Sequence, residues 1–285
     1  MEVTSAQDRA ELERRIASNH DWYHTLELAP GVLTPGIVDV RPIVPRVPIP
    51  ASLEGKRCLD IGTWDGFWAF EMERRGAAEV HAVDVPDPYR WDWPARTRIL
   101  ESYDGGKENL EKIKRNGNGF PIARDALGSS VVRHELTVYE IDPEQLGTFD
   151  FVFVGSLLLH LRDPVGALER IRTVAKGEVV FNDCVEYVLS KLLPRTPTAR
   201  LDDADRVWWW QPNLAALKSM IEQAGFEVLD CGKPYFVPFG RRYEVPPQGL
   251  RDVLHRLRTP KGWEELVMFR NGIAHVALRA RPLTS

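Results

Sequence analysis

Cysteine is scarce in this sequence, and the cysteines present form no recognisable pattern. The 285 residues include three, Cys58, Cys184 and Cys231, with no CxxC pair and no metal-ligand spacing. We therefore expect no disulfide framework and no metal site, and a cytoplasmic location is the simplest interpretation. No apolar run reaches the roughly 18 residues of a membrane-spanning helix, and the N-terminus lacks the apolar core of a secretory signal.

An excess of positive charge is also missing. Lys and Arg number 37 against 41 Asp and Glu, which gives a net charge of −4. Such a chain has no global positive field to attract a nucleic acid or an anionic membrane. Its tight basic cluster, Lys112, Lys114 and Arg115, is offset by Glu108 and Glu111. The 44% hydrophobic and 27% charged residues are ordinary globular values, so a soluble packed protein is expected.

Strand and helix patterns alternate along residues 51–285. The patterns predict strands at 56–61, 79–84, 131–139, 149–159, 178–182, 226–231 and 273–279, and helices at 66–75, 122–127, 164–174 and 213–224. A strand that follows a strand and a helix is expected to be parallel to the first strand. The apolar stretch at 149–159 is typical of a central strand covered on both faces. The predicted fold is α/β, with a seven-stranded, mostly parallel sheet and helices on both faces.

Three segments lie outside this alternation. Residues 1–50 begin with a short helical pattern and continue, from 30 to 50, with many prolines and β-branched residues, which disfavour helix. We expect this segment to form an N-terminal cap. Insertions at about 86–127 and 232–270 are too long for plain connections. The expected organisation is a cap, 1–50, and one domain, 51–285, that carries both insertions.

The stretch LDIGTWDG, at the turn between the first predicted strand and its helix, is the most informative. Glycines at such a turn allow the backbone to approach a ligand closely, and the helix amide groups point into the crevice. Open parallel sheets bind ligands at this edge. A pyrophosphate would be repelled by Asp60 and Asp65, whereas an amino group would be attracted. Gly62 and Gly66 also do not form the G-x-G-x-x-G pattern of dinucleotide sites.

A second acidic residue, Asp84, ends the next predicted strand, about twenty residues after the glycines. A carboxylate there can accept hydrogen bonds from two ribose hydroxyls, each worth about 1.5 to 3 kcal/mol. S-adenosylmethionine (SAM) carries an amine, a sulfonium and a ribose. The two features together, in this order, predict a SAM site, whereas either one alone is common in structural turns.

Four stretches resemble the class I SAM-dependent methyltransferases: LDIGTWDG at 59–66, VHAVDV at 80–85, FDFVFVGSLLLHLRDP at 149–164 and EVVFND at 178–183. The resemblance covers most of residues 51–231. It implies a Rossmann-like fold, SAM as cofactor and S-adenosylhomocysteine (SAH) as product. The cofactor-binding residues that it implies are Asp60, Gly62, Thr63, Trp64, Asp65, Gly66, Asp84, Leu136 and Thr137 near the adenine, and Gly155 and Ser156 at the methionine end.

The third stretch is also similar to the bacterial enzymes that carboxymethylate the wobble uridine of tRNA. Where that group is expected to carry Tyr before the His, this chain has Leu159. The difference argues against carboxy-SAM as the cofactor.

The residues on the acceptor side are harder to predict. His160 follows a central strand and is our first candidate for a general base, although a structural hydrogen bond to backbone is the alternative. Asp183, at the end of the fifth strand, has similar standing. Aromatic residues are expected to bind the substrate, with core packing as the alternative: Trp22, Tyr23 and His24 in the cap, and Trp208 and Trp209 before the last helix.

Three functions fit these patterns. The leading one is methyl transfer to a small molecule, at oxygen or nitrogen rather than carbon, with the cap and insertions enclosing the acceptor. The second is tRNA modification, for which a clustered basic face is expected. The third is a non-catalytic SAM-binding sensor. The acceptor and the oligomeric state do not follow from the sequence.

Overall fold

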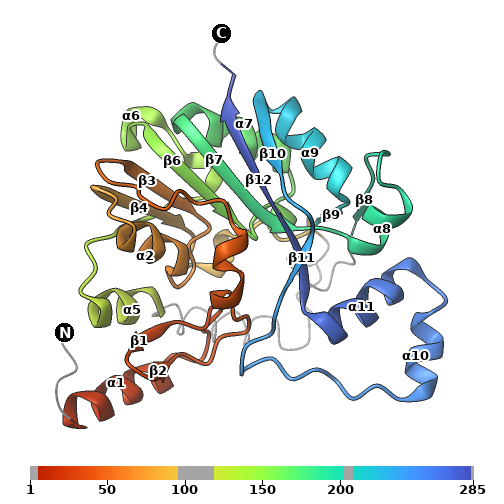
Figure 1. Ribbon diagram of the computed structural model, residues 1–285, viewed down its shortest axis with the longest axis horizontal. Coiled ribbons are helices and arrows are strands. Elements are labelled where there is room, and N and C mark those ends of the chain that lie inside the picture. Colours follow the sequence, from red (N-terminus) through yellow and green to blue (C-terminus); the bar gives the residue numbers. More distant parts are fainter. Residues whose placement is uncertain (1–5, 96–118, 202–207, 284–285) are drawn as a thin grey trace.

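The computed structural model describes residues 6–95, 119–201 and 208–283 (Figure 1). Its central sheet has the order β10-β12-β7-β6-β3-β4-β5, and β11 pairs with β12 as an eighth strand. The strands are β3 (Arg57–Ile61), β4 (Glu79–Asp84), β5 (Val132–Glu135), β6 (Phe149–Gly155), β7 (Ala175–Cys184), β10 (Phe226–Cys231), β11 (Tyr235–Val237) and β12 (Ile273–Pro282). The five strands from β7 to β5 are parallel, and β12 is antiparallel to its neighbours. The predicted α/β fold is confirmed.

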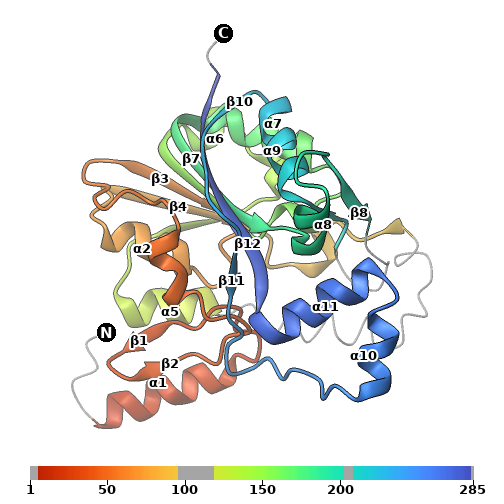
Figure 2. The ribbon, with the colours of Figure 1, turned by 45° about the vertical axis from the view of Figure 1, so that its right-hand side comes forward.

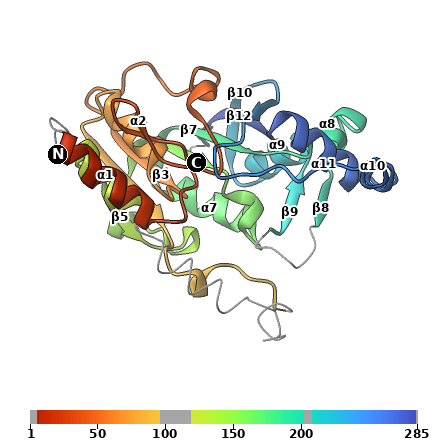
Figure 3. The ribbon, with the colours of Figure 1, turned by 90° about the horizontal axis from the view of Figure 1, so that it is seen from below.

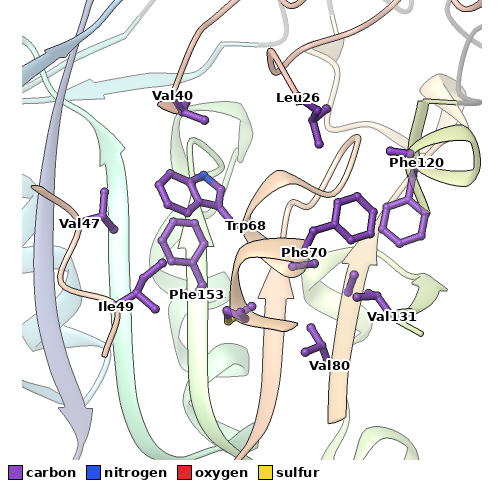
Figure 4. Packing of buried hydrophobic residues seen from close by; sticks show 14 of the residues in the cluster. Leu26, Val40, Val47, Ile49, Trp68, Phe70, Val80, Phe120, Val131 and Phe153 are labelled. Atoms are coloured by element: carbon purple, nitrogen blue, oxygen red, sulfur yellow. The ribbon is translucent and has the colours of Figure 1, made fainter. Parts of the chain in front are cut away.

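Helices cover both faces of the sheet because alternate residues of each central strand point to opposite sides. In β3, for example, Cys58 belongs to one buried cluster and Leu59 to the other. The first cluster includes α2 (Phe67–Arg74) and α5 (Gly119–Leu127), with the Trp68 and Phe153 rings 4.6 Å apart (Figure 4). The second includes α7 (Pro164–Val174) and α9 (Leu214–Gln223) and also buries Leu146, at the end of α6 (Pro143–Leu146).

The N-terminal segment packs into the first cluster. It contains α1 (Ala6–Ser18), the short pair β1 (Glu27–Ala29) and β2 (Val32–Leu33), and the 3-10 helix η1 (Arg41–Arg46). Leu12 and Trp22 are both fully buried there, and the Trp22 indole donates to Ile16 O. The segment lies against α5, on the side of the molecule away from α10 and α11 (Figure 2).

The late insertion forms α10 (Leu250–Arg256) and α11 (Pro260–Asn271), at the opposite end from α1 (Figure 3). α11 contacts α8 (Tyr187–Leu192), and nearby β8 (Ala199–Leu201) pairs with β9 (Trp210–Pro212). Within the described ranges, no helix is both long enough and apolar enough to cross a membrane. The early insertion is described only up to residue 95 and from 119, so the basic cluster at 112–115 lies outside the described residues.

Two strands are shorter than the patterns predict. The strand predicted at 131–139 ends at Glu135, and the 3-10 helix η3 (Val138–Glu140) follows. The strand predicted at 149–159 ends at Gly155, because Ser156 has a left-handed backbone with φ 49°. A second 3-10 turn, η4 (Leu158–His160), comes directly after it. Both turns lie at the carboxyl edge of the parallel strands, where the site is expected.

Candidate active site

The glycine-rich turn lies at the carboxyl end of β3, directly beside the end of β6. A Cβ added to Gly62 would lie 3.5 Å from Gly155 O and 3.4 Å from the Leu157 Cβ, so the two strand ends are in contact. Successive parallel strands run outward in opposite directions from β3 and β6, and such switch points are where open sheets bind ligands. Gly62 and Gly66 have φ values of 80° and 95°, a region that favours glycine.

A buried carboxyl group with an unused oxygen lies in this turn. Asp60 is 1% exposed. Neither its Oδ2 nor Thr63 Oγ1 has a hydrogen-bond partner in the part of the chain that the structure describes. Burial raises the pKa of Asp60 to about 7. An unpaired buried carboxyl oxygen is costly, and a cationic donor would satisfy it. The unpaired oxygen of Asp60 therefore suits an ammonium group such as that of SAM.

Asp84 occupies the equivalent corner at the end of β4. One of its oxygens accepts from Trp64 N and the other from Val85 N, at 2.6 Å for the latter. Each carboxylate oxygen has two acceptor sites, so both keep capacity for a further donor. Burial raises the pKa of this group. The Trp64 bond also holds that residue in a left-handed conformation, with φ 48°. The corner fits the two hydroxyls of a ribose.

The adenine-side candidates, Leu136 and Thr137, follow β5. Leu136 packs against the second buried cluster. Thr137 begins η3 and donates through both N and Oγ1 to Glu140 Oε2, at 2.7 and 3.0 Å. Their place one strand beyond Asp84 agrees with the predicted order of ribose and adenine sites, and their contact with adenine stays a prediction.

Asp65 has contacts in the structure that the sequence did not suggest. Its side chain is fully buried, and Oδ2 accepts from both Tyr23 N and His24 N at 2.9 Å. Its Oδ1 contacts His24 Nδ1. Asp65 thus anchors the N-terminal segment to the glycine-rich turn. Cofactor contact by Asp65 stays a prediction, and the described contacts of both oxygens are with the segment.

The aromatic residues of the N-terminal segment differ in their surroundings, and substrate binding by them stays a prediction. Trp22 is fully buried in the core, which is a packing role. Tyr23 and Trp64 have ring centroids 6.4 Å apart, and Trp64 and Trp91 lie 5.8 Å apart. The start of the early insertion thus returns to the glycine-rich turn, where the Trp91 indole donates to Val85 O at 2.7 Å. The rings of Tyr23 and Trp91 thus lie on either side of a contact with Trp64, whose backbone N donates to Asp84.

The candidate general bases lie at the end of β6 and β7. Asp183 is 1% exposed, and its oxygens accept from Leu157 N, Leu158 N and Cys184 N at 3.1, 2.9 and 2.7 Å. These bonds hold the η4 turn, while burial raises the pKa of Asp183 to about 6. His160 ends that turn, and its backbone N donates to Leu157 O at 2.9 Å. The geometry gives Asp183 a structural role, and catalysis by either residue stays a prediction.

The tryptophan run lies against the same turn. Trp209 N donates to Leu159 O at 2.7 Å, and its indole donates to Asp92 O in the early insertion. Trp208 is the first described residue after the gap at 202–207. Substrate binding by these two residues stays a prediction. Within the residues described, no group of three His, Cys, Asp or Glu side chains could hold a metal ion.

One residue of this edge was missed entirely by the sequence reasoning. His275, on β12, is 2% exposed, and its Nε2 lies 2.8 Å from Ser156 Oγ and 3.4 Å from Cys184 Sγ. The antiparallel pairing of β12 with β7 places His275 opposite Cys184. No local pattern around residue 275 signals this, because the register between two strands so distant in the sequence is set only by the fold.

Comparison with known proteins assigns the chain to a family. The sequence profile described as "Methyltransferase domain" matches residues 39–230, more than half of the chain. The chain belongs to this family. The tRNA U34 carboxymethyltransferases of Pseudomonas aeruginosa and Desulforapulum autotrophicum are 27% and 25% identical to it over 190 and 185 residues. These matches cover 65% and 64% of this chain but 49% and 47% of the relatives, so the chain spans about half of their length.

Among solved structures, the N-terminal domain of EvdMO1, crystallised with SAH bound, has a TM-score of 0.55 to this chain. The match covers 96% of this chain and 97% of that domain at 15% identity, so it shows a shared fold. The family match and the fold together confirm the predicted class I methyltransferase and its cofactor, SAM. Which residues of this methyltransferase domain bind SAM and the acceptor stays a prediction.

Proposed function

We propose that this methyltransferase domain binds SAM at the carboxyl ends of β3 and β4 and methylates a small molecule at oxygen or nitrogen. The observation that carries the proposal is the pair of carboxyl groups at consecutive strand ends, of which Asp60 is buried and Asp84 half-buried. Asp60 has an oxygen with no described partner, and Asp84 has acceptor capacity left on both oxygens. Asp60 is assigned to the SAM ammonium and Asp84 to its ribose.

When bound, with Asp60 at its ammonium and Asp84 at its ribose, SAM would supply an electrophilic methyl group to a lone pair of the acceptor; the C–S electron pair would return to sulfur and the acceptor's proton would pass to water. The chain itself contributes orientation, which can supply about 7 to 11 kcal/mol of the barrier at best. Gly62 allows close approach between the ends of β3 and β6. Tyr23, whose backbone N donates to Asp65, lies beside the glycine-rich turn.

A small acceptor is favoured over tRNA by the negative net charge of −4. The segment that covers the turn is buried against the core, which suits an enclosed acceptor. tRNA modification is the second candidate, because the tRNA U34 carboxymethyltransferases are 27% identical over 190 residues. A gel-shift titration with bulk tRNA separates the two: binding that weakens steeply with salt supports tRNA, and no shift at low salt supports the small molecule.

Calorimetric titration with SAM tests the assigned site. Wild-type protein is expected to bind with micromolar affinity, Asp84→Ala to lose measurable binding and Gly62→Val to bind more weakly. Asp230→Ala, which removes an exposed carboxylate at the end of β10, is the matched control and should bind as wild type. If both site variants keep wild-type affinity, the assignment is wrong.

Turnover needs a separate experiment, because binding alone also fits a sensor. Protein is incubated with methyl-labelled SAM and fractionated extract of the source cell. Label in a small-molecule fraction supports the proposed function, and label in tRNA supports the second candidate. Binding of SAM without label in any fraction would identify a sensor instead.

A further inference from the structure

The late insertion contains a helical hairpin, α10 and α11, that lies at the edge of the molecule in all three views (Figures 1, 2 and 3). Its inner contacts are polar. Glu264 of α11 accepts from Tyr187 N and Val188 N at the start of α8, at 3.0 and 2.9 Å. Arg256 of α10 donates to Glu265 of α11 at 2.9 Å. Arg256 therefore turns toward α11, and Glu264 fixes the hairpin to the rest of the domain.

The other side of α10 is apolar and exposed. Leu250 and Leu254 are four residues apart and Leu257 follows three residues later, so they lie on one face, whereas Arg256 is two residues from Leu254 and points away from it. The exposed fractions of the three leucines are 76%, 54% and 46%. The Trp263 ring joins this face, since it is 46% exposed and its indole donates to Leu257 O at 2.6 Å.

Exposed apolar side chains are concentrated around this hairpin. Of the thirteen large hydrophobic residues that are exposed in the described structure, five lie within 245–263. Single exposed apolar residues are ordinary, whereas a cluster marks an interaction site. None of the seven described residues of α10 is buried, and helices this short gain most of their stability from packing an apolar face. This face therefore calls for a partner that covers it.

The charge around the face indicates the chemistry of that partner. Although the chain has a net charge of −4, residues 245–263 carry +3, from one acidic residue, Asp252, and four basic residues, Arg251, Arg256, Arg258 and Lys261. Asp252 also caps the helix, because its carboxylate accepts from Gly249 N at 3.1 Å. Two copies of this face would repel each other, whereas an anionic partner is complementary to it.

Among anionic partners, the mixture of residue types favours a lipid surface. Basic side chains beside exposed leucines and a tryptophan are typical of helices that lie in the headgroup layer. The leucines can enter the acyl boundary while Arg251 and Arg258 reach the lipid phosphates. A nucleic acid would pair with the arginines but would leave the leucines in water. The position of α10 at the edge of the molecule also suits a flat surface (Figure 3).

We propose that the α10 face, defined as Leu250, Leu254, Leu257 and Trp263, binds the surface of an anionic membrane, with Arg251 and Arg258 at the lipid phosphates. The binding is peripheral, because α10 lies in the headgroup layer and does not cross the bilayer. This inference goes beyond the proposed function, since it concerns a surface that the SAM assignment does not include.

Flotation of the full chain with lipid vesicles tests the proposal. Binding is expected to vesicles of equal parts phosphatidylglycerol and phosphatidylcholine, to weaken at high salt, and to be absent with phosphatidylcholine alone. Leu254→Ser should bind about tenfold more weakly, and Arg251→Gln about fivefold more weakly. Leu127→Ser on α5 and Arg170→Gln on α7 remove exposed residues of the same types elsewhere and should bind as wild type.

A second measurement reads the depth of the α10 face in the wild-type protein. Lipids with brominated acyl chains quench tryptophans that reach the acyl boundary, so they should lower the fluorescence of vesicle-bound protein. Trp263→Phe should lose most of this quenching. Thermal unfolding of each variant at the wild-type temperature confirms that a loss of binding does not reflect misfolding.

Three results would overturn the proposal: no binding to anionic vesicles, equal binding to neutral vesicles, or an equal loss of binding in Leu254→Ser and Leu127→Ser. Two further results would overturn it by identifying another occupant. Without vesicle binding, a dimer in sedimentation that Leu254→Ser abolishes would assign the face to a second copy of the chain. A salt-sensitive gel shift of tRNA that Arg251→Gln abolishes would assign it to nucleic acid.

Discussion

At the scale of single residues, the candidate site depends on carboxyl groups that are buried before any ligand arrives. Asp60 and Asp183 are each 1% exposed, and burial raises their pKa values to about 7 and about 6, from 3.8 in an unfolded chain. In the free protein they hold protons that the unfolded chain would release. Asp183 satisfies its oxygens with three backbone N–H groups, whereas Asp60 keeps one oxygen for a ligand.

The raised pKa values of Asp60 and Asp183 predict how the free energy of unfolding depends on pH. Between about pH 4 and pH 7 the folded state binds more protons than the unfolded state, so the free energy of unfolding should fall as pH rises, by about 1.4 kcal/mol per unit of pKa difference. Asp60→Asn cannot ionise and should flatten part of this slope. Denaturant unfolding of both proteins without SAM, at several pH values in this window, measures the effect. An equal slope in the variant would contradict the raised pKa of Asp60.

The raised pKa of Asp60 also predicts that the protein releases a proton when it binds SAM. If the SAM ammonium pairs with Asp60, the carboxylate form is favoured, and SAM affinity should rise with pH up to about 7. Calorimetry near pH 6 in buffers of different ionisation enthalpy should detect a released proton in the wild type and a smaller release in Asp60→Asn. A release that is the same in both proteins would remove Asp60 from the ammonium site.

Gly66 offers a prediction on packing. A Cβ there would lie 2.4 Å from Phe70 Cε2 and 2.9 Å from Phe120 Cδ2, and φ is 95°. Gly66→Ala should therefore cost about 2 to 4 kcal/mol, from overpacking and backbone strain together. Gly128→Ala separates the two causes, because Gly128 has φ 62° but nothing within 4 Å of an added Cβ. Thermal unfolding of both variants should show the larger loss at Gly66, and equal losses would contradict the steric argument.

At the scale of elements, Asp65 adds hydrogen bonds to the packing that holds the N-terminal segment at the site. Asp65→Asn removes the charge from the bonds to Tyr23 N and His24 N, and hydrogen bonds to charged groups are worth about 1.5 to 3 kcal/mol. Hydrogen exchange at those two amides should therefore become at least about tenfold faster. Asp163→Asn, a similar change at the start of α7, should leave them unaffected. Unchanged exchange in Asp65→Asn would show that packing alone holds the segment.

The elements were predicted best where local signals agree. The helix at 164–174 has the predicted bounds because Asp163 caps it, Pro164 begins it and its apolar residues recur at helical spacing. The strand at 226–231 is likewise confirmed. The prediction at 131–139 ran too far because Thr137 and Glu140 cap a 3-10 turn directly after the strand. The prediction at 149–159 ran too far because an apolar run continues past the strand end into a turn that Asp183 stabilises from β7. Such a long-range hydrogen bond has no counterpart in local sequence.

The site shows the same division. The turn at 59–66 could be predicted because its glycines and acidic residues are neighbours in the sequence. The position of Asp84 could be predicted because it ends the next strand. The engagement of Asp65 by the N-terminal segment, and the position of His275 beside Ser156, arise from contacts between distant parts of the chain. Residue types alone could not distinguish a carboxylate that faces a ligand from one that anchors a segment.

At the scale of the whole molecule, the helices outside the alternating core lie at its two ends. The N-terminal segment is buried against α2 and α5, while α10 and α11 lie at the other end, where α11 contacts α8 (Figure 1). Backbone hydrogen bonds join residues 36–39 of the N-terminal segment to residues 238–242 of the late insertion. The proposed crevice lies between the two ends, at the carboxyl edge of the parallel strands. In the proposed function, the central sheet binds the cofactor and the added segments enclose the acceptor.

Diffraction from crystals grown with SAH tests this account most directly. We predict electron density for the ribose within hydrogen-bond distance of Asp84, for the amino group beside Asp60, and for the sulfur facing Tyr23 and Ser156. Density for SAH elsewhere on the molecule, or side chains that fill the corners at Asp60 and Asp84 in the presence of saturating SAH, would contradict the account.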